Sequence, residues 1–517
     1  MNGAEALLST LVDAGVEICF ANPGTSEMQL VSAIGNTGAM RPVLCLFEGV
    51  VSGAADGYAR MSGKPAATLL HLGSGFSNSL ANMHNARRAG SPVINIVGDH
   101  ASYHLQYDAP LTSDLEGIAR WGSHWHEVAT SPDDLSAAGA RAVHAALEDN
   151  GQIATLIAPA NHAWDEAATP ASALPAPVAG TVPAERITDA ARHIRTGKNT
   201  CLLLGGAALL EANLARLGAL AQVHGVTLMC STFPARLQRG AGRVPVQRLP
   251  YFAEQAAEAL APFDKLILLG ASAPVSFFAY PGKESWLTPG NCELVTLADC
   301  TENLETAVVA LCDALELDAD VATHTERVLH DVADAPLNAL NLGQIVSNEM
   351  PANTIVSDEG ATCGLAAFLC TENAAAHDWL TLTGGAIGQG LPVALGASLA
   401  CPDRKVVALQ ADGSAMYTIQ ALWSMAREAC DVTVVLINNR SYAILNIELE
   451  RVGAGEPNEK TLSMLDLSNP NMDFCAMARG LGVNATRARS TAEFSHQFRE
   501  AMAAPGPHLI EAMLVPE

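Results

Sequence analysis

The sequence predicts an α/β fold of three doubly wound parallel-sheet domains, from its length, its composition and its repeating apolar runs. At 517 residues the chain exceeds what one hydrophobic core usually spans, and this length predicts roughly three domains. Hydrophobic residues make up 49% of the chain and charged residues only 16%, which is enough for a large core. Aromatic residues make up 5%, so Ala, Gly and Val must fill much of the space between closely packed helices and strands.

Short apolar runs alternate with longer amphipathic segments in each third of the chain. Near-continuous Val, Ile and Leu strands separated by helices indicate parallel sheets covered on both faces. Because ligands bind beyond the carboxyl ends of such strands, each strand end is a candidate site position. The expected strands and their following loops are 15–24, 42–49, 66–75, 92–100, 200–208, 226–231, 265–273, 354–361, 405–413 and 432–439.

Two stretches interrupt this alternation and predict the domain boundaries. Residues 169–186, "TPASALPAPVAGTVPAER", are rich in Pro and Ala and lack helical periodicity. Residues 317–337 are polar and contain a proline near their end. The predicted domains therefore span 1–168, 187–318 and 338–517, each near the usual domain size.

Charge and cysteine usage exclude several classes of partner. A formal net charge of −25 argues against a nucleic-acid surface, which needs clustered Lys and Arg. The twelve cysteines form no CxxC pair, and the chain has no signal-peptide pattern, so we expect reduced thiols in the cytoplasm. No apolar run reaches the roughly 18 residues of a membrane span, so no membrane partner is expected.

Two expected strands end in small oxygen-bearing side chains. Asp412 and Asn439 lie 27 positions apart, each directly after an apolar run. Parallel strands joined by a right-handed crossover bring such ends close together, where a carboxylate and an amide oxygen suit Mg²⁺. The helix that opens at Asp412 would also offer N–H groups to a diphosphate. Two ordinary turns are the alternative interpretation.

A Gly-rich loop and a buried acid support the ligand-binding interpretation. Gly384, Gly385, Gly388 and Gly390 would let the backbone approach a flat ligand, although many such loops only turn the chain. Glu48 is expected to end an apolar strand and to face a helix of small residues. Desolvation of a carboxyl group there would favour its neutral form and suit it to proton transfer. The alternative is that Glu48 caps the helix or is solvated.

Taken together, these motifs resemble the thiamine-diphosphate (ThDP) enzymes of the pyruvate-oxidase-like branch, which includes acetolactate synthase and benzoylformate decarboxylase. The motifs are "NPGTSE" (22–27), "EGVVSGAADGYARMSGKPA" (48–66), "GGAIGQGLPVALGA" (384–397) and the Asp-Gly to Asn-Asn segment. The last motif usually opens with Gly-Asp-Gly, and here Ala411 replaces the first glycine. The resemblance runs essentially from end to end.

The resemblance implies the organisation of the subunit. The N-terminal domain would bind the aminopyrimidine, the central domain would be Rossmann-like, and the C-terminal domain would bind the diphosphate and Mg²⁺. It also implies a homodimer or homotetramer with active sites at the subunit interface. FAD binds the central domain of several relatives. Here Gly205 and Gly206 lack a GxGxxG fingerprint, so FAD is left open and unsupported.

Residue roles follow from the same resemblance. Glu48 would bind the pyrimidine N1′, and Ile387 would lie under the thiazolium and bend the cofactor. Asp412, Asn439 and the backbone oxygen of Ser441 would hold the metal. The implied cofactor contacts are Pro23, Gly24, Glu48, Asn78, Thr362, Gly385, Ile387, Asp412, Gly413, Ser414, Tyr417, Asn439, Ser441 and Tyr442.

The implied substrate pocket consists of Thr25, His71, Leu111, Phe277 and Leu445. Glu48, His71 and Thr25 are the implied catalytic residues; His71 matches a histidine of benzoylformate decarboxylase, and Thr25 falls where a serine touches the substrate carboxylate. Phe277 takes the place of that enzyme's second histidine. A pocket so poor in proton donors favours bond formation with a second carbonyl over release of an aldehyde.

The implied activity is decarboxylation of a small 2-oxo acid, with the enamine either protonated to an aldehyde or ligated to a second carbonyl. The enzyme would be a lyase or a transferase; the acid and the acceptor are left open. The alternative is a ThDP-binding protein without turnover, although retention of Glu48, Asp412 and Asn439 argues against it. A nicotinamide dehydrogenase would need a Gly fingerprint that "CFANPGTSE" does not supply.

Overall fold

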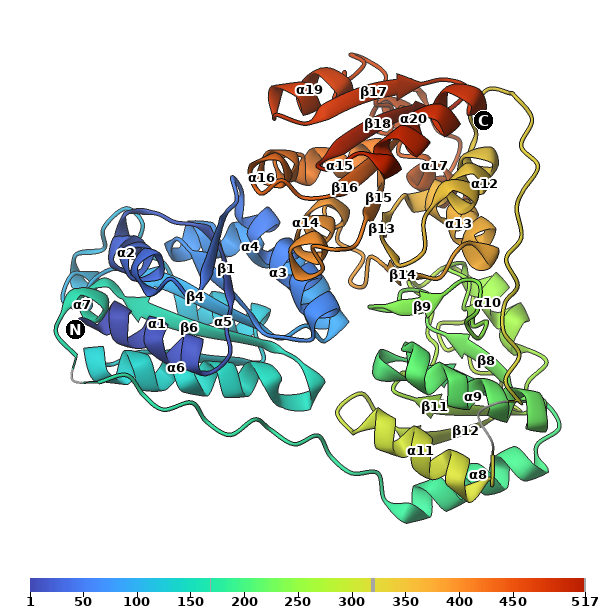
Figure 1. Cartoon of the computed structure of the whole chain (residues 1–517), viewed down its shortest axis with the longest axis horizontal. Helices are drawn as coiled ribbons and strands as arrows, with labels where there is room; N and C mark the ends of the chain where they lie inside the picture. The colour runs from blue at the N-terminus through green and yellow to red at the C-terminus, as the bar shows by residue number, and fades with distance from the viewer. Residues whose placement is uncertain (168, 318–320, 516–517) are drawn as a thin grey trace.

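The computed structural model describes residues 1–167, 169–317 and 321–515, and within these residues it contains three sheets flanked by helices (Figure 1). The predicted fold class is confirmed. The predicted domain ends at 168, 318 and 517 lie outside the described residues. No helix in the described ranges is long and apolar enough to cross a membrane.

The first sheet has the strand order β2-β1-β3-β4-β6-β5, with parallel pairs throughout. Its strands are β1 (Ile18–Asn22), β2 (Arg41–Leu44), β3 (Ala66–Leu70), β4 (Val93–Asp99), β5 (Trp125–Val128) and β6 (Ile153–Pro159). The helices are α1 (Gly3–Asp13), α2 (Met28–Thr37), α3 (Glu48–Ser62), α4 (Leu72–Ala89), α5 (Leu115–Gly122), α6 (Pro132–Leu147) and α7 (Ala160–Trp164), with a 3-10 turn, η1 (Thr25–Glu27).

The second sheet, in the central domain, has the order β10-β8-β7-β11-β12. Its strands are β7 (Thr200–Leu204), β8 (Thr227–Cys230), β10 (Gln247–Arg248), β11 (Lys265–Leu269) and β12 (Glu293–Ala298). Its helices are α8 (Ala184–Thr196), α9 (Glu211–His224), α10 (Ala253–Leu260) and α11 (Leu304–Ala314). Most of the stretch 169–186 is extended coil that joins the first domain to α8.

The third sheet has the order β17-β18-β16-β15-β13-β14-β9. Its strands include β13 (Thr354–Glu359), β14 (His377–Leu380), β15 (Val406–Ala411), β16 (Val432–Asn438), β17 (Asn484–Ala488) and β18 (His508–Met513). Its helices are α12 (Ala339–Glu349), α13 (Ala361–Cys370), α14 (Gly390–Ala400), α15 (Asp412–Thr418), α16 (Ala421–Arg427), α17 (Ala443–Arg451), α18 (Glu459–Ser463), α19 (Phe474–Gly480) and α20 (Thr491–Ala503).

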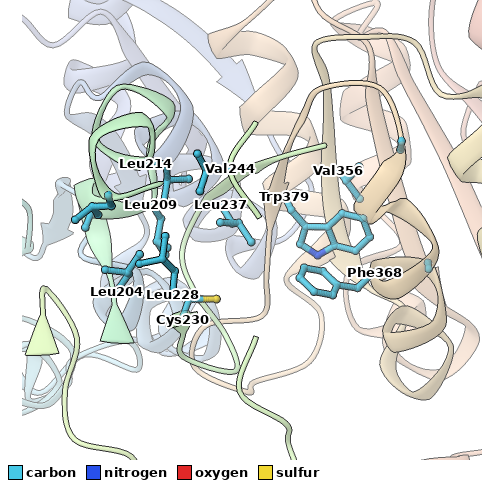
Figure 2. Packing of buried hydrophobic residues seen from close by; sticks show 14 of the residues in the cluster. Leu204, Leu209, Leu214, Leu228, Cys230, Leu237, Val244, Val356, Phe368 and Trp379 are labelled. Carbon is cyan, nitrogen blue, oxygen red and sulfur yellow. The ribbon is translucent and has the colours of Figure 1, made fainter. Parts of the chain in front are cut away.

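Strand β9 (Leu237–Arg239) departs from the purely parallel expectation. It lies between β8 and β10 in the sequence, yet it pairs antiparallel with β14 of the third sheet, Leu237 opposite Trp379. Leu237 and Trp379 are both buried in one hydrophobic cluster that runs from the central domain into the C-terminal domain (Figure 2). The central domain is therefore joined to the C-terminal sheet by the pairing of β9 with β14 and by a common hydrophobic core.

Arg239 strengthens this junction. Its guanidinium lies 3.7 Å from the ring centre of Phe368 and donates to the Phe368 carbonyl at 2.7 Å and to Thr371 Oγ1 at 3.0 Å. Burial lowers the pKa of Arg239 to about 9. A buried cation is tolerated here because it stacks on an aromatic ring and is hydrogen-bonded.

Replacing Leu237 by Ala should therefore destabilise the protein by about 2–5 kcal/mol, because it leaves a cavity between two domains. The measurement is urea unfolding followed by far-UV circular dichroism. Leu329→Ala is the matched control, since that leucine is largely exposed and its loss should cost less than about 0.5 kcal/mol. Equal midpoints for the two variants would contradict the shared core.

Candidate active site

Glu48 is a buried residue of the N-terminal domain. It is the first residue of α3, not the end of a strand, because β2 already ends at Leu44. Glu48 is only 7% exposed, and its two carboxylate oxygens accept from Asn22 Nδ2 at 2.9 Å and from Asn78 Nδ2 at 3.0 Å. Asn22 ends β1 and Asn78 lies on α4, so two elements orient one carboxylate.

His71 lies beside Glu48 at the start of α4. An ideal Cβ on Gly75 would lie 3.2 Å from Glu48 Oε1 and 3.3 Å from His71 Cβ, so both side chains flank the first turn of the helix. His71 Nδ1 is 2.8 Å from Glu27 Oε2, and Glu27 is completely buried. The exposed Thr25 lies in the same 3-10 turn as Glu27.

The second group of predicted residues gathers at the carboxyl ends of β15 and β16, which run side by side with Ala411 opposite Ile437. Asp412 is buried and accepts the Arg440 N–H at 2.6 Å through Oδ2 and the Gly413 N–H at 2.7 Å through Oδ1. Asn439 Oδ1 accepts the Ser441 N–H at 3.0 Å. The loop that carries Asn439 and Ser441 is thus tied to Asp412.

The chemistry of this group fits a divalent cation. Burial raises the pKa of Asp412, and the groups that oppose the shift are backbone N–H donors and not a basic side chain. A cation with oxygen ligands would provide the missing positive charge, which suits Mg²⁺. The ring of Tyr442 lies close over Gly413, where an added Cβ would come within 2.3 Å of Tyr442 Cε1.

A buried carboxylate also fixes the Gly-rich loop. Glu359, at the end of β13, accepts N–H groups from Gly388 at 2.6 Å, Gln389 at 3.2 Å and Gly390 at 2.8 Å, and a fourth hydrogen bond from Gln410 Nε2 at 2.8 Å. Burial raises the pKa of Glu359, and these donors oppose the shift. The loop beside Ile387 and the first turn of α14 are therefore held by one side chain.

Helix α4 reaches the same loop from the N-terminal domain. Asn82 Nδ2 donates to the Gly388 carbonyl at 2.9 Å, and Asn85 Nδ2 donates to the Ala386 carbonyl at 2.7 Å. Figure 1 shows α3 and α4 next to α14, at the junction of the two domains. Ile387 thus lies in a segment that is hydrogen-bonded on both sides.

Three non-glycine residues at these strand ends have left-handed backbone conformations. They are Leu72 (φ +49°) after β3, Ala361 (φ +49°) after β13 and Arg440 (φ +59°) after β16. Such conformations are costly for residues with a Cβ and are concentrated at functional sites. Thr362 follows Ala361 in the first turn of α13.

The remaining predicted residues have the following places. Phe277 is partly exposed, with ring centres 5.7 Å from Phe233 and 5.4 Å from Tyr251, and a Cβ on Gly385 would lie 2.7 Å from its Cζ. Leu111 lies in exposed coil before α5, and Leu445 is exposed on α17. Their roles, and those of Pro23, Gly24, Ser414 and Tyr417, stay predictions.

Family models match both of these regions. The N-terminal TPP binding domain of thiamine pyrophosphate enzymes matches residues 1–122, and the C-terminal TPP binding domain matches residues 358–512. The chain is also 48% identical to IlvX of Mycobacterium tuberculosis, over 99% of each chain; that protein carries a provisional name as an acetolactate synthase large subunit.

The chain belongs to the thiamine pyrophosphate enzyme family. This thiamine pyrophosphate enzyme is 28% identical to benzoylformate decarboxylase of Pseudomonas aeruginosa over 96% of each chain. Its fold is similar to that of a solved ThDP-dependent 4-hydroxybenzoylformate decarboxylase of Rhodococcus jostii, with a TM-score of 0.86, 25% identity and all of both chains covered. The resemblance found in the sequence is confirmed.

Sequence reasoning missed four residues of this thiamine pyrophosphate enzyme: Asn22, Glu27, Glu359 and Gln410. Glu27 and Glu359 lie inside segments that the sequence singles out, "NPGTSE" and "TIVSDEGA". Their position at the end of a strand or in the loop after one was a usable signal. Their burial was not visible, because it depends on which segments cover them.

Glu359→Gln should reduce the free energy of unfolding by about 1.5–3 kcal/mol, because an NH₂ group then faces backbone N–H donors. Urea unfolding measures the loss, and hydrogen exchange of the amides 388–390 should accelerate. Glu284→Gln, at an exposed glutamate of the central domain, is the control and should change stability by less than about 0.5 kcal/mol. Unchanged exchange at these amides would show that Glu359 does not hold the loop.

Proposed function

We propose that this enzyme uses ThDP and Mg²⁺ to decarboxylate a small 2-oxo acid. The observation that carries the proposal is the burial of Glu48 in the N-terminal cofactor-binding domain with both oxygens oriented by amides. A protein that only bound the cofactor would not need a buried carboxylate with both oxygens oriented by hydrogen bonds. When bound, ThDP supplies the electron sink for loss of CO₂, and the protein supplies position and electrostatics.

The C-terminal group would hold the diphosphate end. Asp412, the Asn439 side chain and the Ser441 backbone oxygen would bind Mg²⁺. Ile387 would support the thiazolium ring, because Glu359 and Asn82 hold the backbone next to it. The further cofactor contacts would come from Pro23, Gly24, Asn78, Thr362, Gly385, Gly413, Ser414, Tyr417 and Tyr442.

The N-terminal group would hold the pyrimidine and the substrate. Glu48 would bind the pyrimidine ring nitrogen, and Thr25 would offer its hydroxyl to the substrate carboxylate. His71 would exchange a proton with the reacting carbonyl compound, since its Cβ and the Glu48 carboxylate both flank Gly75 in the first turn of α4.

The apolar surroundings favour carboligation over aldehyde release. Phe277 packs with other aromatic rings, and Leu111 and Leu445 add no proton donor. With few donors near the reacting carbon, attack on a second carbonyl compound competes well with protonation. Relatives named for both outcomes, acetolactate synthases and benzoylformate decarboxylases, are similar to this chain.

The complete site would lie between two subunits of a homodimer or homotetramer. Glu48 and Asp412 belong to different domains, and each group alone binds one end of the cofactor. Large apolar side chains exposed on α13 and α15 support this assembly, because a second subunit would remove their surface from water. They are Leu365, Leu369, Met416 and Tyr417.

Glu48→Gln should lower the rate of CO₂ release by about 10²–10⁴-fold, because proton transfer by a positioned acid contributes that much. The assay follows pyruvate, benzoylformate and a branched 2-oxo acid with ThDP and Mg²⁺, and identifies products by mass. Glu17→Gln, at an exposed glutamate of the same domain, should keep the wild-type rate. ThDP binding without CO₂ release from any acid would favour a binding protein without turnover.

A further inference from the structure

A buried acid behind His71 suggests how that histidine is controlled. Glu27 ends the 3-10 turn η1 and has no exposed surface. Its Oε2 accepts the Gly24 N–H at 2.7 Å and lies 2.8 Å from His71 Nδ1. Its Oε1 is in contact with the Ser26 hydroxyl. Donors therefore surround the carboxylate, and it acts as an acceptor towards each of them.

We propose that Glu27 is the positioning residue for His71, fixing the proton on Nδ1 so that Nε2 faces the reacting carbonyl compound. The proposal rests on the proposed function and deepens it. A ring whose Nδ1–H is bound to a carboxylate has its lone pair on Nε2, and it gains stability when Nε2 takes a proton. The His71 side chain is 20% exposed, which leaves it accessible to a small molecule.

Glycines on both sides show that this arrangement is tightly built. An ideal Cβ on Gly24 would lie 2.2 Å from His71 Nδ1, and one on Gly98, in β4, would lie 1.8 Å from Glu27 Oε1. Any larger residue at either position would displace the ring or the carboxylate. An ideal Cβ on Gly75 would lie 3.3 Å from His71 Cβ and 3.2 Å from Glu48 Oε1, so both side chains flank the same turn of α4. The ring itself is confined by Gly24 on the side of its partner acid.

The pair has a specific consequence for this chain. Phe277 takes the place that a second histidine has in benzoylformate decarboxylase, so proton exchange with substrate depends on His71. The tautomer of His71 depends in turn on Glu27. A purely structural role is the competing explanation, since Glu27 also caps its own 3-10 turn through the Gly24 N–H.

A double-mutant cycle on the ThDP- and Mg²⁺-loaded enzyme separates the two explanations. Glu27→Gln should lower kcat by about 10–100-fold, as loss of a partner behind a functional histidine typically does, with ThDP affinity within about threefold of wild type. In a His71→Ala background the same substitution should change kcat by less than about threefold. An undiminished loss in that background would overturn the proposal.

Glu5→Gln is the matched control. Glu5 is also a capping carboxylate of the N-terminal domain, accepting the Asn2 N–H at 3.0 Å, but it has no histidine partner among the residues that the structure describes. It should keep the wild-type kcat while losing a little stability. If Glu27→Gln does not fold, Glu27→Asp is used in its place. The aspartate keeps the negative charge but holds it one methylene further from His71. This variant should lose less kcat than Glu27→Gln, and the loss should again vanish in the His71→Ala background.

Carbethoxylation by diethyl pyrocarbonate tests the pair without turnover. The reagent attacks an unprotonated ring nitrogen, so at a pH where the ring is neutral in both proteins Nε2 of His71 should react readily in the wild-type protein, as followed by peptide mass spectrometry. Glu27→Gln should slow this reaction at least about threefold, whereas Glu5→Gln should not. An unchanged rate would overturn the proposal. If no 2-oxo acid is turned over, the proposed function fails, but this reaction still decides whether Glu27 controls His71.

Discussion

Four buried carboxylates, in the segments that follow parallel strands or end one, fix the loops on which this enzyme depends. Glu27 and Glu48 lie in the N-terminal domain, and Glu359 and Asp412 lie in the C-terminal domain. A buried carboxylate must be hydrogen-bonded or paired, so each one gathers N–H groups from the chain around it. The loops are therefore shaped by the need to satisfy these acids, and the residues that would meet cofactor and substrate are carried by those loops.

One face of α4 connects the two halves of this arrangement. Asn78, Asn82 and Asn85 follow one another at the spacing that places side chains on one face of a helix. Asn78 orients Glu48, while Asn82 and Asn85 bind backbone carbonyls of the Gly-rich loop. A shift of this helix would change the orientation of Glu48 and the loop of Ile387 together. The two domains of one chain are thus coupled through three amide side chains.

The sequence was sufficient for most of the sheets and for the proximity of two of the predicted site segments. Apolar runs located the main parallel strands, and the pairing of β15 with β16 brings Asp412 to the loop of Asn439 as expected. Strand β9 could not be predicted, because three residues carry no periodic pattern and their partner lies about 140 positions away. Glu27 and Glu359 resemble solvated acids in the sequence, since only tertiary packing buries them.

The central claim is that Asp412 and Asn439 form the metal and diphosphate end of a ThDP site. Calorimetric titration of the protein with ThDP, with and without Mg²⁺, tests it most directly, on wild type and on Asp412→Asn. We expect Mg²⁺-dependent binding to the wild type, weakened at least about tenfold in the variant, because a metal ligand loses its charge. Equal affinity for ThDP in both proteins, or binding indifferent to Mg²⁺, would show that Asp412 does not hold the metal.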